Sequence, residues 1–321
     1  MVNRLGPISL RVSVTDRCSL RCQHCTPPEG LARFGPDDIL RYEEILAFVR
    51  VIKSARGLAK VHLTGGEPLR RRDVVSLTAM LAGEGVADLA MTTNAQRLAA
   101  HAGSLRRAGL ARVNVSLCSL EPETFAAFTG GGTLAATLAG IEAALKECLP
   151  VKINTTLLAG VNDEQLCEIV RFAHARGVEA RFIELMPLGA AARLHAKRFF
   201  SADDTMKRLA REFSLTPLAR QPGSSARMVQ ATDAAGVSGR IGLISSCSLP
   251  FCSDCNRLRL TADGLVIGCL AHGGGLDVKA ILRAGSATRD QALLDAVGVV
   301  MGQKRRDESF TSVRCMAQVG G

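Results

Sequence analysis

A chain of 321 residues, 47% of them hydrophobic, is long enough to bury a large core and to form one big domain or two ordinary ones. No apolar run approaches the ~18 residues of a membrane span, and the N-terminus lacks a secretory pattern, so we expect a globular cytoplasmic protein with no membrane partner. The formal charge of +10 favours an anionic partner. With 4% aromatic residues and no Trp, nucleic acid is disfavoured and a small polyphosphate fits at least as well.

The first two thirds of the chain alternate short β-branched runs with longer amphipathic stretches, which is typical of βαβ units and a parallel sheet. In chain order, strands are predicted at residues 8–15, 60–64, 88–92, 112–117, 151–157 and 179–185. Helices are predicted at residues 42–54, 74–82, 134–146 and 164–175. Six such units are too few for a closed eight-stranded barrel. We therefore predict an α/β fold built on a partial, open TIM-type barrel.

The alternation stops past Pro187, and a polar stretch at residues 220–225 leads into short strands, a second group of cysteines and a tail. We predict a barrel at residues 1–218 and a C-terminal region at residues 219–321. In such barrels ligands bind at the carboxyl ends of the strands. The loops there contain cysteines after the first strand, residues 65–68 (GGEP) after the second and residues 92–94 (TTN) after the third.

Eleven cysteines in a chain expected to be cytosolic indicate metal binding or redox chemistry rather than disulfides. Cys18, Cys22 and Cys25 place three thiols on one short loop. Three thiolates can hold a corner of a cubane iron–sulfur cluster and leave one iron open for a chelating substrate, such as the amino and carboxylate groups of a methionine. A structural zinc site with His24 as fourth ligand is the alternative.

A second group consists of Cys252, Cys255 and Cys269, again three ligands rather than four. Cys247 lies close enough in the sequence to complete a zinc site, so zinc stays open here as well. The remaining cysteines match no ligand pattern and are expected to be small buried hydrophobic residues: Cys118, Cys148, Cys167 and Cys315.

The CxxxCxxC loop followed by GGEP resembles the radical S-adenosylmethionine superfamily. Within it, four motifs resemble the GTP 3',8-cyclase family of molybdenum cofactor biosynthesis: residues 13–18 (SVTDRC), 64–68 (TGGEP), 181–187 (RFIELMP) and 252–259 (CSDCNRLR). The tail at residues 314–321 (RCMAQVGG) also matches. The resemblance runs from about Arg11 to Gly321 and implies two 4Fe-4S clusters, one on each cysteine triad, the second positioned to bind the guanine base.

The resemblance also implies roles for individual residues. Those expected to contact S-adenosylmethionine are His24, Gly66, Glu67, Ser116 and Met186. Those expected to bind GTP are Arg11, His62, Thr92, Lys152, Arg257 and Arg259, with Lys60 and Arg181 as candidates to assist. Arg257 and Arg259 are also expected to take part in catalysis, as are Cys18, Cys22 and Cys25 and the tail pair Gly320 and Gly321, which is thought to insert into the active site.

Four positions depart from the family pattern. His24 stands where an aromatic residue is usual, and His62 replaces an Arg near the phosphates, which removes one charge at neutral pH unless its pKa is raised. Ala95 replaces a Gly, and Cys118 replaces an Asp. These departures concern the substrate rather than the assembly of the clusters.

The activity that the resemblance implies is the conversion of GTP to (8S)-3',8-cyclo-7,8-dihydroguanosine 5'-triphosphate. An electron donor and cyclic pyranopterin monophosphate synthase, as acceptor of the product, are the implied partners, and a homodimer stays open. Three rivals remain: a peptide-modifying radical enzyme with an auxiliary cluster, a relative that acts on another nucleotide, and a zinc-bearing nucleic-acid-binding protein. The last lacks an aromatic-rich basic segment.

Overall fold

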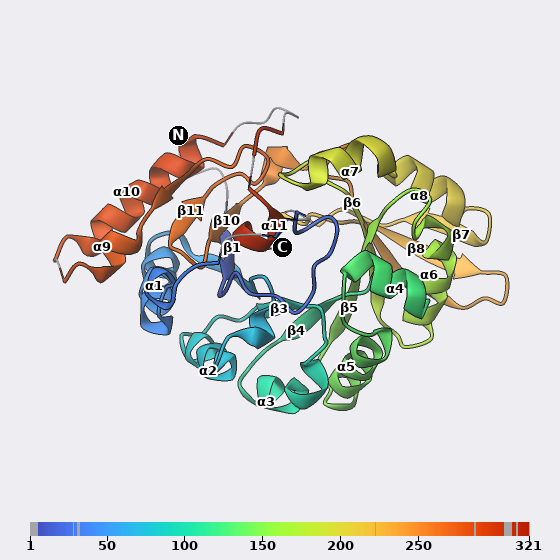
Figure 1. The fold of residues 1–321 in the computed structure, drawn as a ribbon, viewed down its shortest axis with the longest axis horizontal. Coiled ribbons are helices and arrows are strands. Elements are labelled where there is room, and N and C mark those ends of the chain that lie inside the picture. Colours follow the sequence, from blue (N-terminus) through green and yellow to red (C-terminus); the bar gives the residue numbers. More distant parts are fainter. Residues whose placement is uncertain are drawn as a thin grey trace.

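The computed structural model describes residues 6–27, 29–30, 33–221, 223–285, 287–304, 310–312 and 314–320. In this part of the chain, a single curved sheet contains twelve strands in the order β12-β11-β10-β1-β2-β3-β4-β5-β6-β9-β8-β7. Figure 1 shows the sheet as an open ring with helices α1, α2, α3 and α5 on its outside. The predicted partial barrel is confirmed.

Six parallel strands follow one another as the alternation predicts. They are β1 (Ile8–Ser13), β2 (Leu58–Thr64), β3 (Leu89–Thr93), β4 (Arg112–Ser116), β5 (Val151–Leu157) and β6 (Glu179–Glu184). The helices between and after them are α1 (Tyr42–Arg56), α2 (Val74–Gly83), α3 (Ala102–Arg107), α4 (Pro122–Thr129), α5 (Leu134–Lys146), α6 (Leu166–His174), α7 (Ala191–Arg198) and α8 (Ala202–Leu209). Each of the four predicted helices forms, with bounds within two residues; α3, α4, α7 and α8 were not predicted.

The later part of the chain adds parallel strands to both edges of these six. Strand β10 (Arg257–Leu260) pairs with β1, and β9 (Ser238–Ile244) pairs with β6. Antiparallel strands extend each edge further, namely β11 (Leu265–Ile267), β12 (Gly275–Asp277), β8 (Arg227–Asp233) and β7 (Phe213–Pro217). The remaining helices are α9 (Lys279–Arg283), α10 (Arg289–Gly302) and α11 (Met316–Val319). Strands from both sides of residue 218 thus share one sheet, and the domain boundary stays a prediction.

Strand β1 shows why the inside of the ring is polar. Leu10 and Val12 are fully buried and belong to the hydrophobic core, whereas Arg11 between them lines a cavity inside the ring. Successive side chains of a strand point to opposite faces, so apolar residues pack under the outer helices while the alternate residues face inward. This alternation of side chains along the strands therefore places the polar residues of the site inside the ring.

Helix α1 illustrates how the outer layer is built. It begins with the acidic residues Glu43 and Glu44, has the basic residues Lys53 and Arg56 in its last turn, and is followed by Gly57 with φ +70°. These charges complement the helix dipole, and the glycine tolerates the positive φ at the stop. No single helix in the described ranges is both long and apolar enough to cross a membrane, although the bent pair α4 and α5 meets the criterion together by length and composition.

Candidate active site

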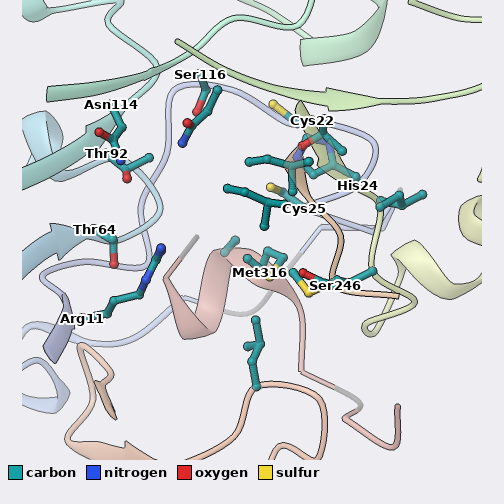
Figure 2. Close-up of a pocket in the computed structure, with 18 of the residues that line it drawn as sticks. Arg11, Cys22, His24, Cys25, Thr64, Thr92, Asn114, Ser116, Ser246 and Met316 are labelled. Carbon is teal, nitrogen blue, oxygen red and sulfur yellow. The ribbon is translucent and has the colours of Figure 1, made fainter. Parts of the chain in front are cut away.

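A cavity of about 340 Å³ occupies the inside of the ring and is lined by all six cysteines of the two triads. Its wall also includes the loops after the strands and the inward-facing residues of β4, β5 and β6. Figure 2 shows Arg11 and Thr64 on one side of this cavity and Cys22, Cys25 and His24 on the other. The predicted S-adenosylmethionine contacts all lie on its wall: His24, Gly66, Glu67, Ser116 and Met186.

The first triad sits on a tight turn. The N–H groups of Cys25 and Thr26 both donate to the Cys22 carbonyl, at 2.9 and 3.1 Å. The Cys18 Sγ accepts from the Leu20 N–H at 3.3 Å and from the Asn94 amide at 3.6 Å. Burial raises the pKa of Cys25 to about 12, so the bare thiols hold their protons. Because thiolates are the ligands of iron, binding of iron by these thiols would release those protons.

Two hydrogen bonds fasten the glycine loop to the backbone that leads into Cys18. The Gly66 N–H donates to the Thr15 carbonyl at 2.6 Å, and the Glu67 N–H donates to the Arg17 carbonyl at 2.8 Å. A Cβ atom on Gly66 would lie 2.6 Å from the Arg17 oxygen and 2.7 Å from the Asp16 oxygen. Gly66 was expected to contact S-adenosylmethionine and does line the cavity, but the close approach that requires a glycine here is to the chain's own cysteine loop.

The Glu67 carboxylate is buried and bonded within the protein. One oxygen accepts from the Leu69 N–H at 3.0 Å and the Thr93 hydroxyl at 2.7 Å, and the other accepts from the Asn94 N–H at 2.7 Å. Burial raises the pKa of this carboxyl, and the three hydrogen bonds oppose that shift. Glu67 therefore joins the loop after β2 to the loop after β3, which places Asn94 beside Cys18.

The second triad comes from two loops, since Cys252 and Cys255 precede β10 and Cys269 follows β11, and all three cysteines line the cavity. Burial alone would raise the pKa of Cys255, but the nearby charges of Arg257 and Lys304 lower it to about 7. This thiol is consequently prepared to act as an anionic ligand near neutral pH.

Cys247 does not join the second triad. Its Sγ donates to the Leu185 carbonyl at 3.5 Å, and its N–H donates to the buried Glu184 carboxylate at 2.9 Å. Within the described ranges, no group of three or more His, Cys, Asp or Glu side chains could hold a single metal ion. A cubane cluster offers a separate iron to each thiolate, so the thiols of a triad need not converge on one point.

His24 places a buried ring nitrogen at the cavity wall. Among the described residues nothing hydrogen-bonds to its buried Nδ1, and its ring packs 5.3 Å from that of Phe128, inclined at 60°. Burial lowers the pKa of His24 to about 4, so the ring is neutral at physiological pH. A buried polar atom with no protein partner at a cavity wall fits contact with a bound ligand.

Positive charge is concentrated on the side of the cavity away from the first triad. Arg11, Arg181, Arg257 and Arg259 all line it, and the Arg257 guanidinium stacks 4.1 Å from the Phe251 ring. Burial, followed by repulsion from Arg257 and Arg181, lowers the pKa of Arg11 to about 10. Crowded cations that lower one another's pKa favour the binding of a polyanion, and Arg suits phosphate because its donors form a fork.

Two predicted GTP ligands lie behind this wall rather than on it. His62 shares a hydrogen bond of 2.8 Å with Thr92, which lines the cavity. Lys152 pairs with Glu179 at 3.1 Å, and Glu179 also pairs with Arg181. Burial and the charges of Arg11 and Arg112 lower the pKa of His62 well below 6.5. The charge lost with the family's Arg is therefore not restored by His62.

The structure also brings in residues that sequence reasoning missed. The buried Oδ1 atoms of Asn114 and Asn154, on neighbouring strands, have no hydrogen-bond partner among the described residues, and both side chains line the cavity. Their position on alternate, inward-facing residues of β4 and β5 was the signal that could have found them.

The tail reaches the cavity. Met316 and Ala317 of α11 line it, and the Gly320 carbonyl accepts a hydrogen bond from Arg259. Gly320 adopts φ +79°, and a Cβ atom there would collide with the Thr64 hydroxyl. Gly321, also predicted to be catalytic, lies outside the described residues.

Comparison with known proteins agrees with this arrangement. A family profile described as "Radical SAM superfamily" matches residues 12–173, and one described as "Molybdenum Cofactor Synthesis C" matches residues 178–310. The chain is 40% identical over 318 residues to a GTP 3',8-cyclase of Pelotomaculum thermopropionicum and 39% identical over 320 residues to that of Moorella thermoacetica, covering 97% of both chains in each case. It is 40% identical over 306 residues to GTP 3',8-cyclase 1 of Pseudomonas aeruginosa, covering 94% of this chain and 91% of that one.

The crystal structure of Streptococcus suis SuiB bound to S-adenosylmethionine shares the fold, with a TM-score of 0.63 at 13% identity over 98% of this chain and 77% of that one. The fold, the cysteine loop and the matching profile place the chain in the radical S-adenosylmethionine superfamily. The similarity over nearly the full length of the named relatives identifies a narrower group within this superfamily. The chain belongs to the GTP 3',8-cyclase family.

The glycine loop yields a first prediction. Gly66→Ala should destabilise the protein by about 1–3 kcal/mol, because its Cβ has to displace the backbone oxygens that lead into Cys18. Urea unfolding of the metal-free chain measures the free energy, and iron per chain after anaerobic reconstitution should fall as well. Gly83→Ala is the control, since a Cβ there meets nothing within 4 Å. Equal loss in both variants would contradict the assignment.

His62 yields a second prediction, concerning pH. The unfolded chain takes up a proton near the ordinary His pKa of 6.5, whereas the folded chain does not. The stability that depends on neutral His62 is therefore present above pH 6.5 and lost below it, by up to about 1.4 kcal/mol per pH unit. His62→Asn should melt with a smaller decrease in Tm on acidification than the unmodified chain. An identical decrease in the two proteins would contradict a buried, neutral His62.

Proposed function

We propose that this chain is a GTP 3',8-cyclase that holds a 4Fe-4S cluster on each cysteine triad and converts GTP to (8S)-3',8-cyclo-7,8-dihydroguanosine 5'-triphosphate, the first step of molybdenum cofactor biosynthesis. The single observation that supports it best is that both triads and four arginines line the same cavity. A radical enzyme with a polyphosphate substrate needs these two features together.

Cys18, Cys22 and Cys25 would hold the first cluster, with one iron left for S-adenosylmethionine. When bound, this cluster and S-adenosylmethionine supply a 5'-deoxyadenosyl radical, which abstracts hydrogen. The chain's own share is to hold the reactants. His24, Ser116 and Met186 line the cavity where that ligand would lie. Glu67 acts indirectly, because its oxygens are occupied by the loop after β3.

The arginines would bind and orient GTP. Arg11, Arg181 and Arg257 offer forked donors to phosphate oxygens, and Thr92 is held toward the cavity by neutral His62. Cys252, Cys255 and Cys269 would hold the second cluster beside Arg257, with its open iron available to the guanine base. Binding the phosphates and the base at the same time would hold the ribose in one position. Holding reactants in a reactive geometry lowers the entropic part of the barrier.

We further infer a cytoplasmic location, a reductant that donates electrons, and cyclic pyranopterin monophosphate synthase as the enzyme that takes the product. We also propose that the two parts of the chain on either side of residue 218 supply different parts of the site. The earlier residues supply the first triad and most of the ring, while the later residues supply the second triad, Arg257, Arg259 and the tail.

Anaerobic reconstitution with iron and sulfide, followed by incubation with GTP, S-adenosylmethionine and a strong reductant, tests the proposal. Mass spectrometry should detect 5'-deoxyadenosine and the cyclised nucleotide in comparable amounts. ATP is the matched control substrate, because it offers the same triphosphate on a different base, and it should give no cyclised product. Formation of 5'-deoxyadenosine without cyclised GTP would overturn the substrate while leaving the superfamily intact.

A further inference from the structure

Lys304 approaches the second triad from behind the cavity wall. It follows α10, and its Nζ donates to the carbonyl oxygens of Cys255 and Arg257 at 3.0 and 2.6 Å. The same Nζ lies 3.7 Å from the Cys255 Sγ, within hydrogen-bonding range for sulfur. Lys304 is absent from the residues that line the cavity in the described part of the chain. It therefore contacts a cluster ligand without facing the substrate.

Close packing of α10 brings Lys304 to this position. Leu293, Val297 and Val300 of α10 belong to the hydrophobic core. A Cβ atom on Gly268, the residue before Cys269, would collide with the Val300 carbonyl and lie 3.5 Å from the Lys304 Cγ. The missing side chain at Gly268 thus lets the end of α10 lie against the cluster loop. The packing of α10 in the core therefore places the Lys304 ammonium group next to Cys255.

An ammonium group that donates to a cysteine sulfur has a definite effect on an iron–sulfur cluster. Hydrogen bonds to the sulfurs and nearby charge are among the factors that set the reduction potential. The reduced cluster has one more negative charge than the oxidised cluster, so a fixed cation stabilises the reduced state more. The potential should accordingly be higher with Lys304 than without it.

We propose that Lys304 is a positioning residue that raises the reduction potential of the cluster held by Cys252, Cys255 and Cys269, through the positive charge that its ammonium group places beside the Cys255 sulfur. The inference rests on the proposed function, because the second triad must hold a redox-active cluster. Arg257 faces the cavity instead and is available to the substrate. The two cations beside Cys255, Lys304 and Arg257, thus have separate tasks.

The test uses the full chain with Cys18, Cys22 and Cys25 replaced by Ala, so that only the second cluster assembles. Redox titration followed by electron paramagnetic resonance gives its midpoint potential. Lys304→Met should lower the equilibrium constant for reduction about tenfold, which for a one-electron couple is about 59 mV. Lys304→Arg should restore most of the difference. Lys279→Met is the matched control, since that Nζ pairs with Asp38 at 3.6 Å and should leave the potential unchanged.

Each outcome is decisive. An unchanged potential in Lys304→Met would overturn the inference and leave Lys304 a structural contact between two carbonyls. If Lys304→Met loses its iron, Lys304→Gln decides, because the amide retains a donor without the charge: a lowered potential supports the inference, and an unchanged one overturns it. Failure of the triad to bind iron with Lys304 intact would instead overturn the proposed second cluster, and this inference with it.

Discussion

The site depends on the close approach of two loops, residues 15–17 and residues 65–67. Two backbone hydrogen bonds join them, and the fit is so close that a Cβ atom on Gly66 would collide with the backbone oxygens of Asp16 and Arg17. Glu67 extends this connection to Asn94, whose amide reaches the Cys18 sulfur. Three consecutive strand ends are thereby fixed relative to one another before any ligand binds. A cluster bound on this loop takes its place from the sheet rather than from the loop itself.

The fold must also accommodate several positive charges inside the ring. The strands place arginines inside the ring, where burial and mutual repulsion lower the pKa of Arg11 and Arg259. Glu179 balances part of this charge by pairing with Lys152 and Arg181, and Arg259 donates a hydrogen bond to the Gly320 carbonyl. A bound triphosphate would offset the remaining excess of positive charge. Neutral His62 fits this account, because it holds Thr92 without adding repulsion.

Much of this could be predicted from the sequence, because local patterns determine it. The helix at residues 134–146 was predicted with its observed bounds, and Thr133 caps it through the Ala136 N–H. Pairing between distant segments was not predictable. The register of Arg11 opposite Arg259 on β10 and the contact of Lys304 with Cys255 join parts of the chain that only folding brings together. The sequence also did not reveal why a glycine is needed at position 66. The backbone that it contacts, at Asp16, lies 50 residues earlier in the sequence.

In the proposed function, both triads act on one GTP in one cavity. Replacing Cys252, Cys255 and Cys269 together by Ala separates the two triads, and the ratio of cyclised nucleotide to 5'-deoxyadenosine is measured. The first triad remains, so 5'-deoxyadenosine should still form, while cyclised nucleotide should fall close to the level of the control without GTP. A ratio equal to that of the unmodified chain would contradict the account, because the second triad would then have no part in placing the substrate.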